Sequence, residues 1–385
     1  MCIRGIFSFY TFAQNIVVPD SPTMSSLTDS ENIKHLTHEV ISLLKRLIET
    51  QSFSREEEHT AALIQDFFKQ KEIPFQTKKN NIWAYNKCFD VAKPTVLLNS
   101  HHDTVKPNKS WTLNPFQALV EGDKLFGLGS NDAGGCLVSL IATFCHFYDR
   151  EDLTYNIVIA ATAEEEVSGK EGLEIVVPEL PEISFAIVGE PTEMHLAVAE
   201  KGLLVLDCTT KGKSGHAARE EGDNAIYKAI RDIEWIRNYQ FPKVSPTLGP
   251  IKMSVTIISA GTQHNVVPDT CVFTIDVRAT DQYTLEEIIE VIRENVQSEV
   301  SARSIRLRPS SIPMEHPIVQ AGLKRGRTAY GSPTTSDQAL LDCPSLKMGP
   351  GHSERSHTAD EFIYLHEIET GILQYISMLE EVVTI

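Results

Sequence analysis

Closely spaced histidines and carboxylates are the residues of this chain best suited to chemistry. His101 and Asp103 follow a branched apolar run, so on an extended strand their side chains share one face and His102 points away. His101 is therefore a candidate metal ligand, and Asp103 is a candidate partner that orients its ring. A lone His-x-Asp is more often structural, so the pair needs support from the rest of the chain.

Carboxylates also follow the next apolar runs. Asp132 comes after a glycine-rich turn and just ahead of an expected helix, where it could equally be a helix cap. Glu164, Glu165 and Glu166 are adjacent; a solvated charge run is the usual explanation, but a cation among them would relieve their repulsion. Glu190 ends a further run. No Gly-Lys-Ser/Thr follows the glycines, which disfavours a phosphate loop.

One of two histidines near the C-terminus, His352 or His357, completes the set. Together the clusters place His, Asp, Glu, Glu and His at successive loop positions of one domain. Two histidines and three carboxylates suit zinc or a similar divalent ion. A single catalytic zinc usually takes three protein ligands, so two ions that share a bridging carboxylate fit this set better.

The elements that must position these residues alternate between strands and helices. Branched apolar runs at 95–99, 155–161 and 185–188 are typical of buried strands, and a helix-like stretch at 135–146 lies between the first two. This order predicts an α/β fold with a largely parallel sheet flanked by helices. Ligands bind at the carboxyl ends of such strands, which is where the polar clusters fall.

Helical periodicity also marks the two ends of the chain. Apolar residues share one face over 34–50 and again over 363–383. A second helix is expected to start at Ser54, with Glu57 completing a capping box. A short strand is expected at 345–348.

The pattern of expected strands and helices changes after about residue 197. We expect residues 198–309 to form an inserted α+β domain, and residues 24–197 and 310–385 to form the catalytic domain. The first 23 residues are predicted to be a disordered extension rather than a signal peptide, because they carry a single basic residue and no A-x-A cleavage site.

Composition excludes several classes of protein. The formal net charge of −17 argues against nucleic-acid binding, which needs a basic face. The chain contains no run of 18 apolar residues, so no membrane-spanning helix is predicted. The seven cysteines are scattered and form no C-x-x-C pair, which argues against a disulfide framework and favours a reducing compartment. We therefore expect a cytoplasmic protein.

Five motifs, taken in order, resemble those of the co-catalytic zinc amidohydrolases. That family includes acetylornithine deacetylase, succinyl-diaminopimelate desuccinylase, aminoacylase and glutamate carboxypeptidase. The likeness covers nearly the whole chain, and it implies a zinc-peptidase-like catalytic domain with an inserted lid and dimerisation domain, and hence a homodimer. The motifs lie at 100–105, 129–135, 163–166, 188–192 and 357–361.

The resemblance implies a ligand set for two divalent ions. Zinc is the default, with cobalt or manganese as alternatives. Asp132 would bridge both ions. His101 and Glu190 would complete one site, and Glu166 and His357 would complete the other.

The resemblance also implies roles beside the ligands. Glu165 would be the general base, and Asp103 would support the ring of His101. The family has a cis peptide after its bridging aspartate, so Asp132–Ala133 is expected to be cis.

Two assignments keep an alternative. Strand alternation would pair Glu164 with Glu166, whereas the family uses the last two members of its acidic triplet. His352 could replace His357, although the family spacing favours His357.

The inserted domain carries three further candidates by the same resemblance. His216 resembles the lid histidine that reaches the partner subunit's active site and helps to stabilise the oxyanion. Asn265 would contact substrate. Arg278 would clamp a substrate carboxylate, and a strand-surface ion pair is an equally good explanation for it.

The expected reaction is hydrolysis of the amide of a small N-acyl amino acid. The sequence at 188–192 and 349–351 most resembles that of acetylornithine deacetylase. This resemblance implies release of ornithine from N-acetyl- or N-succinylornithine in arginine biosynthesis. A succinyl carboxylate could be met by Lys201 or Lys213. The alternatives are a succinyl-diaminopimelate desuccinylase, a dipeptidase or aminoacylase of the same fold, and an inactive metal-binding scaffold. The scaffold is disfavoured because Glu165 and all five ligands are present.

Overall fold

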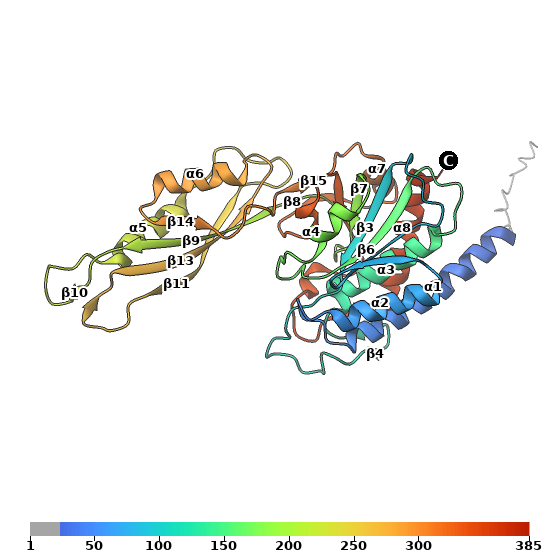
Figure 1. Ribbon diagram of the computed structural model, residues 1–385, viewed down its shortest axis with the longest axis horizontal. Coiled ribbons are helices and arrows are strands. Elements are labelled where there is room, and N and C mark those ends of the chain that lie inside the picture. The colour runs from blue at the N-terminus through green and yellow to red at the C-terminus, as the bar shows by residue number, and fades with distance from the viewer. Residues whose placement is uncertain (1–23, 385) are drawn as a thin grey trace, which may run out of the picture.

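The computed structural model describes residues 24–384, with side chains from residue 31 onward. A large α/β body and a long arm make up the molecule (Figure 1). The expected extension at 1–23 lies outside the described residues. No helix within the described range is both long and apolar enough to cross a membrane.

The large body is built on a nine-stranded mixed sheet. Its strand order is β1-β2-β6-β3-β7-β17-β8-β15, with β16 paired to β8. The central neighbours β6, β3, β7 and β17 run parallel, so the predicted parallel centre is confirmed. The strands are β1 Phe75–Lys78, β2 Asn81–Tyr85, β3 Thr95–His101, β6 Asn156–Thr162, β7 Ile183–Val188, β8 Leu196–Glu200, β15 Ser310–Ser311, β16 Ala329–Ser332 and β17 Ser345–Lys347.

Both faces of this sheet are buried. On β3, Val96 and Leu98 belong to the main apolar core, while Leu97 points into a smaller core on the opposite face. Alternation along a strand explains this division. The main core is covered by α1 Met24–Ile48, α2 Glu58–Gln70, α3 Gly135–Phe147, α7 Pro317–Lys324 and α8 Leu365–Val383; the smaller core is covered by α4 Leu173–Val176.

The arm is a four-stranded antiparallel sheet in the order β11-β13-β9-β14. One face of this sheet packs on α5 and α6 around a core of its own. A two-stranded ribbon of β10 and β12 lies at its far end (Figure 1). The elements are β9 Gly202–Lys211, β10 Gly215–His216, α5 Ala225–Asn238, β11 Lys252–Ala260, β12 Val266–Val267, β13 Thr270–Ala279, α6 Leu285–Asn295 and β14 Glu299–Ala302.

Short elements fill the rim of the large body. A small sheet in the order β18-β5-β4 lies beside a distorted turn at residues 130–134. These elements are β4 Leu119–Glu121, β5 Lys124–Phe126, β18 Phe362–Tyr364, the π-type turn η1 Ser130–Gly134, and the 3-10 turns η2 Val177–Glu179, η3 Asp337–Leu340 and η4 Ser353–Arg355.

One local prediction is wrong. Helix α2 begins at Glu58 and has no side-chain cap, so Ser54 and Glu57 do not form a capping box. The Ser54 hydroxyl instead donates to Asp103 at 2.7 Å, and the Glu57 carboxylate accepts from Asn80 at 2.8 Å. Both side chains are drawn away from the helix by polar partners that come from distant parts of the chain.

Candidate metal centre

The candidate site lies where β3, β6 and β7 end side by side. In the parallel register, His101 pairs with Thr162. Asn99 pairs with Val188, so the third strand ends at nearly the same level. His101 is the last residue of β3, the acidic triplet begins two residues after β6, and Glu190 lies two residues after β7. Short loops at one sheet edge therefore bring these groups together.

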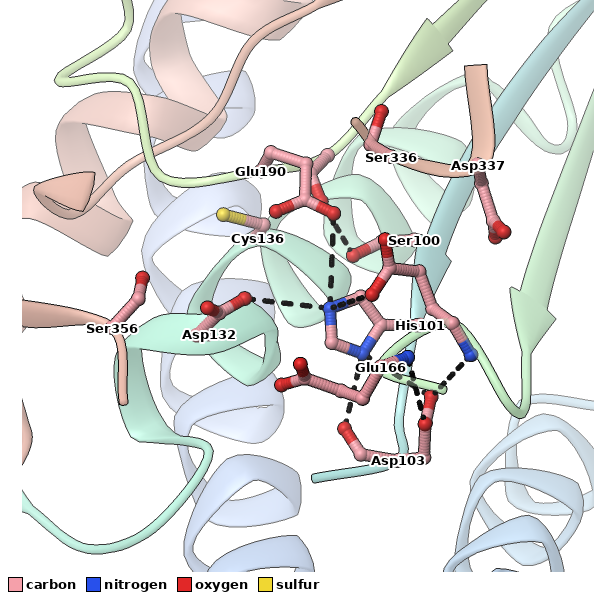
Figure 2. A network of polar contacts seen from close by, with 12 residues as sticks. Ser100, His101, Asp103, Asp132, Cys136, Glu166, Glu190, Ser336, Asp337 and Ser356 are labelled. Carbon is pink, nitrogen blue, oxygen red and sulfur yellow. Dashed lines mark hydrogen bonds and ion pairs between the residues drawn. The ribbon is translucent and has the colours of Figure 1, made fainter. Parts of the chain in front are cut away.

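Asp132 lies between two histidines from distant parts of the chain. Its Oδ1 is 3.4 Å from Nε2 of His101 (Figure 2), and its Oδ2 is 3.5 Å from Nε2 of His357. Glu190 Oε1 is 3.7 Å from the same His101 nitrogen. Glu166 Oε2 is 2.9 Å from Nε2 of His357. One carboxylate thus faces two half-sites, each with a histidine and a further carboxylate.

His101 faces carboxylates from three loops through its Nε2 atom. Its Nε2 is buried and makes no hydrogen bond. Its Nδ1 lies 3.0 Å from the backbone oxygen of Asp103 and 3.4 Å from Oδ1 of the same residue. A neutral imidazole that donates through Nδ1 carries its lone pair on Nε2. A divalent cation beside Nε2 would satisfy this lone pair and the surrounding carboxylates, so the residues fit a metal.

Asp103 also shapes the loop that carries the acidic triplet. Its two carboxylate oxygens accept from the backbone N–H groups of Glu165 at 3.1 Å and Glu166 at 3.2 Å (Figure 2). Burial alone would raise the pKa of Asp103, but its contacts with His101 lower that pKa below the usual range. A charged Asp103 can hold the imidazole and the loop at once.

The triplet turns, so strand alternation does not continue through it. Glu164 has a positive φ of 58°, and its side chain accepts from the backbone of Glu171 at 3.3 Å. Glu165 Oε2 is 3.9 Å from Nε2 of His101. The last two glutamates therefore face the site, while Glu164 holds the loop.

His357, rather than His352, faces the carboxylate cluster. The His352 side chain accepts from the backbone of Glu354 at 3.1 Å and lies 3.4 Å from Glu193. His357 has a φ of 60°, a left-handed conformation that non-glycine residues adopt rarely. The hydrogen bond to Glu166, with burial opposing it, raises the pKa of His357 to about 9.

A buried carboxylate holds Asp132 from behind. Glu361 Oε1 accepts from the backbone N–H groups of Asn131 at 2.8 Å and Asp132 at 3.0 Å. Burial, followed by the charge of Asp132, raises the pKa of Glu361 to about 8. The Asp132–Ala133 peptide is cis, as predicted.

Burial makes the ionised form of these carboxylates unfavourable unless a cation compensates their charge. Desolvation raises the pKa of Glu165 well above its usual value and that of Glu190 to about 8. Crowded buried carboxylates of this kind are stabilised by positive charge. In each of two overlapping sets, the candidate ligand atoms all lie within 4.8 Å of one another. The sets are His101, Asp132 and Glu166, and His101, Glu165 and Glu190.

Known proteins resemble this chain over most of its length. Residues 198–303 match the M20 peptidase dimerisation domain. An acetylornithine deacetylase from Proteus mirabilis is 28% identical over 93% of this chain and 92% of its own length. A hydrolase of LysW-lysine and LysW-ornithine from Sulfurisphaera tokodaii is 27% identical over 88% of this chain and 94% of its own.

Solved structures share the fold. An M20 family metallo-carboxypeptidase from Sulfolobus solfataricus has a TM-score of 0.72 at 16% identity, covering 89% of this chain and 99% of its own. A dinuclear metal-binding M20 peptidase from Bacillus subtilis has a TM-score of 0.69 at 17% identity, covering 90% and 99%. The chain is a metal-dependent hydrolase that is similar to M20-type enzymes over most of its length. The resemblance and the α/β fold predicted from the motifs are therefore confirmed.

The candidate centre of this hydrolase opens into a cavity of about 490 Å³. Neither Lys201 nor Lys213 lines it, and Lys201 instead donates to the backbone oxygen of Pro250 at 2.6 Å. The lysine that lines the cavity is Lys347, which sequence reasoning missed. Its only signal was a charge within an expected buried strand. Its ammonium lies 3.0 Å from the fully buried Glu200, so the charge is already paired.

The structure does not bring the candidates of the lid tip to the carboxylates. His216 lies on β10, at the end of the arm far from the catalytic body (Figure 1). The backbone N–H of Ala217 donates to the backbone oxygen of Asn265 at 3.0 Å, so the two candidates are neighbours there. Within residues 31–384, no contact joins either of them to the metal ligands.

Arg278 has features of both roles considered for it, the strand-surface ion pair and the clamp for a substrate carboxylate. Its guanidinium makes a two-point ion pair with Asp276, at 2.9 and 3.1 Å. Its remaining nitrogen is 3.4 Å from Oγ1 of Thr335, a residue that lines the cavity. The ion pair is present, and the guanidinium also contacts a residue that lines the cavity.

Proposed function

We propose that this M20-type hydrolase cleaves the amide of an N-acyl amino acid, with N-acetylornithine or N-succinylornithine as substrate and ornithine as product. The acetylornithine deacetylase of Proteus mirabilis supports this choice because its likeness extends over nearly the whole chain. The name of the Sulfurisphaera tokodaii relative also specifies an ornithine derivative.

The observation that carries the proposal is the position of Asp132. Its two oxygens face His101 and His357 separately, as a bridge between two divalent ions requires. We assign His101 and Glu190 to one ion and Glu166 and His357 to the other, with zinc as the proposed metal and cobalt or manganese as alternatives. Ions bound there would supply Lewis acidity and lower the pKa of water towards 7.

The side chains of the chain itself divide the remaining work. Glu165 takes a proton from the attacking water as the C–O bond forms. It then delivers that proton to the amide nitrogen, so that the C–N bond breaks and the amine leaves. Asp103 holds the ring of His101 and the backbone of Glu165 in place. Thr335 lines the cavity where the substrate carboxylate would lie, and Arg278 contacts Thr335.

The distant lid tip supports a homodimer. Within one chain His216 is remote from the carboxylates (Figure 1), so its oxyanion role requires that His216 of the partner subunit enters the site. The matched dimerisation domain supplies a surface for such an assembly. We propose the cytoplasm as its compartment, because scattered cysteines without C-x-x-C pairs favour a reducing environment.

Substrate turnover tests the proposal. Metal-replete full-length protein would be assayed for amine release from N-acetylornithine, N-succinylornithine, N-succinyl-diaminopimelate and two dipeptides. The proposal predicts that an acylornithine gives the highest kcat/KM, that chelator abolishes turnover and that zinc restores it. Preference for a dipeptide or for the diaminopimelate derivative would replace the proposed substrate. Zinc uptake without any hydrolysis would favour the inactive scaffold.

A further inference from the structure

The chain crosses between the two bodies twice, and the two crossings pack together. The outgoing crossing joins β8 to β9 at Gly202, and the returning one joins β14 to β15 through Leu307. The backbone N–H of Leu203 donates to the backbone oxygen of Leu307 at 3.0 Å. A Cβ on Gly202 would lie only 2.7 Å from that oxygen, so no side chain fits between the crossings.

Arg306 lies on the returning crossing and reaches into the catalytic body. Its Nη2 donates to the backbone oxygens of Ser168 and of Gly169, the latter at 3.0 Å. Its Nη1 donates to Glu174 Oε2 at 2.9 Å. The Arg306 side chain is only 19% exposed, so these bonds are largely shielded from water.

Those two carbonyls belong to the turn that carries the acidic triplet. The backbone N–H of Ser168 donates to the oxygen of Glu165 at 2.7 Å, and that of Gly169 donates to the oxygen of Glu164 at 2.8 Å. Glu164 and Ser168 both have positive φ, at 58° and 47°. Backbone in this region persists when its surroundings impose it.

We propose that Arg306 is a positioning residue, which fixes the turn 164–169 from behind and links its geometry to the lid crossing. This inference rests on the proposed function of Glu165 and Glu166, since the turn matters for hydrolysis only if they act there. Asp103 holds the near side of the turn through the N–H groups of those two glutamates. Arg306 holds the far side through carbonyls, so the turn is clamped at both ends.

The test compares Arg306→Ala with Arg303→Ala in the full-length protein. Arg303 lies three residues earlier and pairs with Asp207 on the lid, so it is a matched loss of guanidinium without contact to the turn. For Arg306→Ala we expect faster amide hydrogen exchange in 164–172, metal affinity and kcat lower by about 10- to 100-fold, and little change in KM. We expect Arg303→Ala to match the wild type in all four.

Two further measurements separate positioning from a general loss of folding. Arg306→Lys keeps the charge but not the fork of donors, so it should fall between Arg306→Ala and the wild type. Added guanidinium should restore part of the activity of Arg306→Ala. Unchanged exchange in 164–172, or an equal effect of Arg303→Ala, would overturn the proposal. Hydrogen exchange and metal affinity need no substrate, so they test Arg306 even if the proposed reaction fails.

Discussion

At the scale of single residues, the chemistry depends on how one sheet edge distributes carboxylates around two histidines. The candidate ligands were predictable because each lies in a distinctive sequence motif. Asp103, which holds His101, was predicted in the same way, but other residues that hold the site were not. Ser54, Glu361 and Arg306 act through backbone or carboxylate contacts whose partners lie 49 or more positions away. Sequence spacing carries no signal for such contacts.

Glu165 offers the sharpest test at this scale. Glu165→Gln keeps the shape of the side chain but cannot take a proton, so we expect kcat to fall by a factor on the order of 10²–10⁴. Metal content should stay at the wild-type level, because the other carboxylates hold the ions. Steady-state kinetics and elemental analysis of the same sample give both numbers, and wild-type turnover would refute the assignment of Glu165 as base.

At the scale of elements, polar contacts between segments override local helix signals. The Ser54-x-x-Glu57 pattern has the residue types and spacing of a capping box, yet Ser54 donates to Asp103. The same signal succeeds at α6, where Thr284 and Glu287 do form a capping box. The difference is tertiary: buried carboxylates of the site lie close to the first segment.

Substitutions at Ser54 and Thr284 are therefore expected to affect different properties, activity in the first case and stability in the second. Ser54→Ala should weaken metal affinity or activity by up to about tenfold, because Asp103 loses a partner. Thr284→Ala should leave activity unchanged and lower the unfolding free energy by about 1 kcal/mol, because α6 loses its cap. Denaturant titration and kinetics on both variants check this; swapped effects would show that Ser54 acts as a cap after all.

At the scale of the whole molecule, the distance between lid tip and catalytic body decides how the parts can cooperate. The sequence predicted both an inserted lid and the α/β body. No local pattern predicts how far His216 lies from the metal ligands of its own chain, since that depends on the direction of the arm (Figure 1). Only the resemblance to a lid histidine that reaches the partner subunit implied such a separation.

Mixing two inactive variants tests cooperation between subunits. His216→Ala and Glu165→Gln should each be nearly inactive alone. In a mixed dimer, the subunit that retains Glu165 receives His216 of the partner subunit, so one of two sites is intact. Random exchange should restore about a quarter of wild-type activity. Mixtures that stay as inactive as their components would place His216 outside the partner's site.

The central claim is that two divalent ions share Asp132. Anomalous diffraction from crystals grown with zinc measures this directly. We predict two peaks about 3.5–4 Å apart, one beside His101 and Glu190, the other beside His357 and Glu166, with Asp132 between them. A single peak, or two peaks that Asp132 does not bridge, would contradict the account.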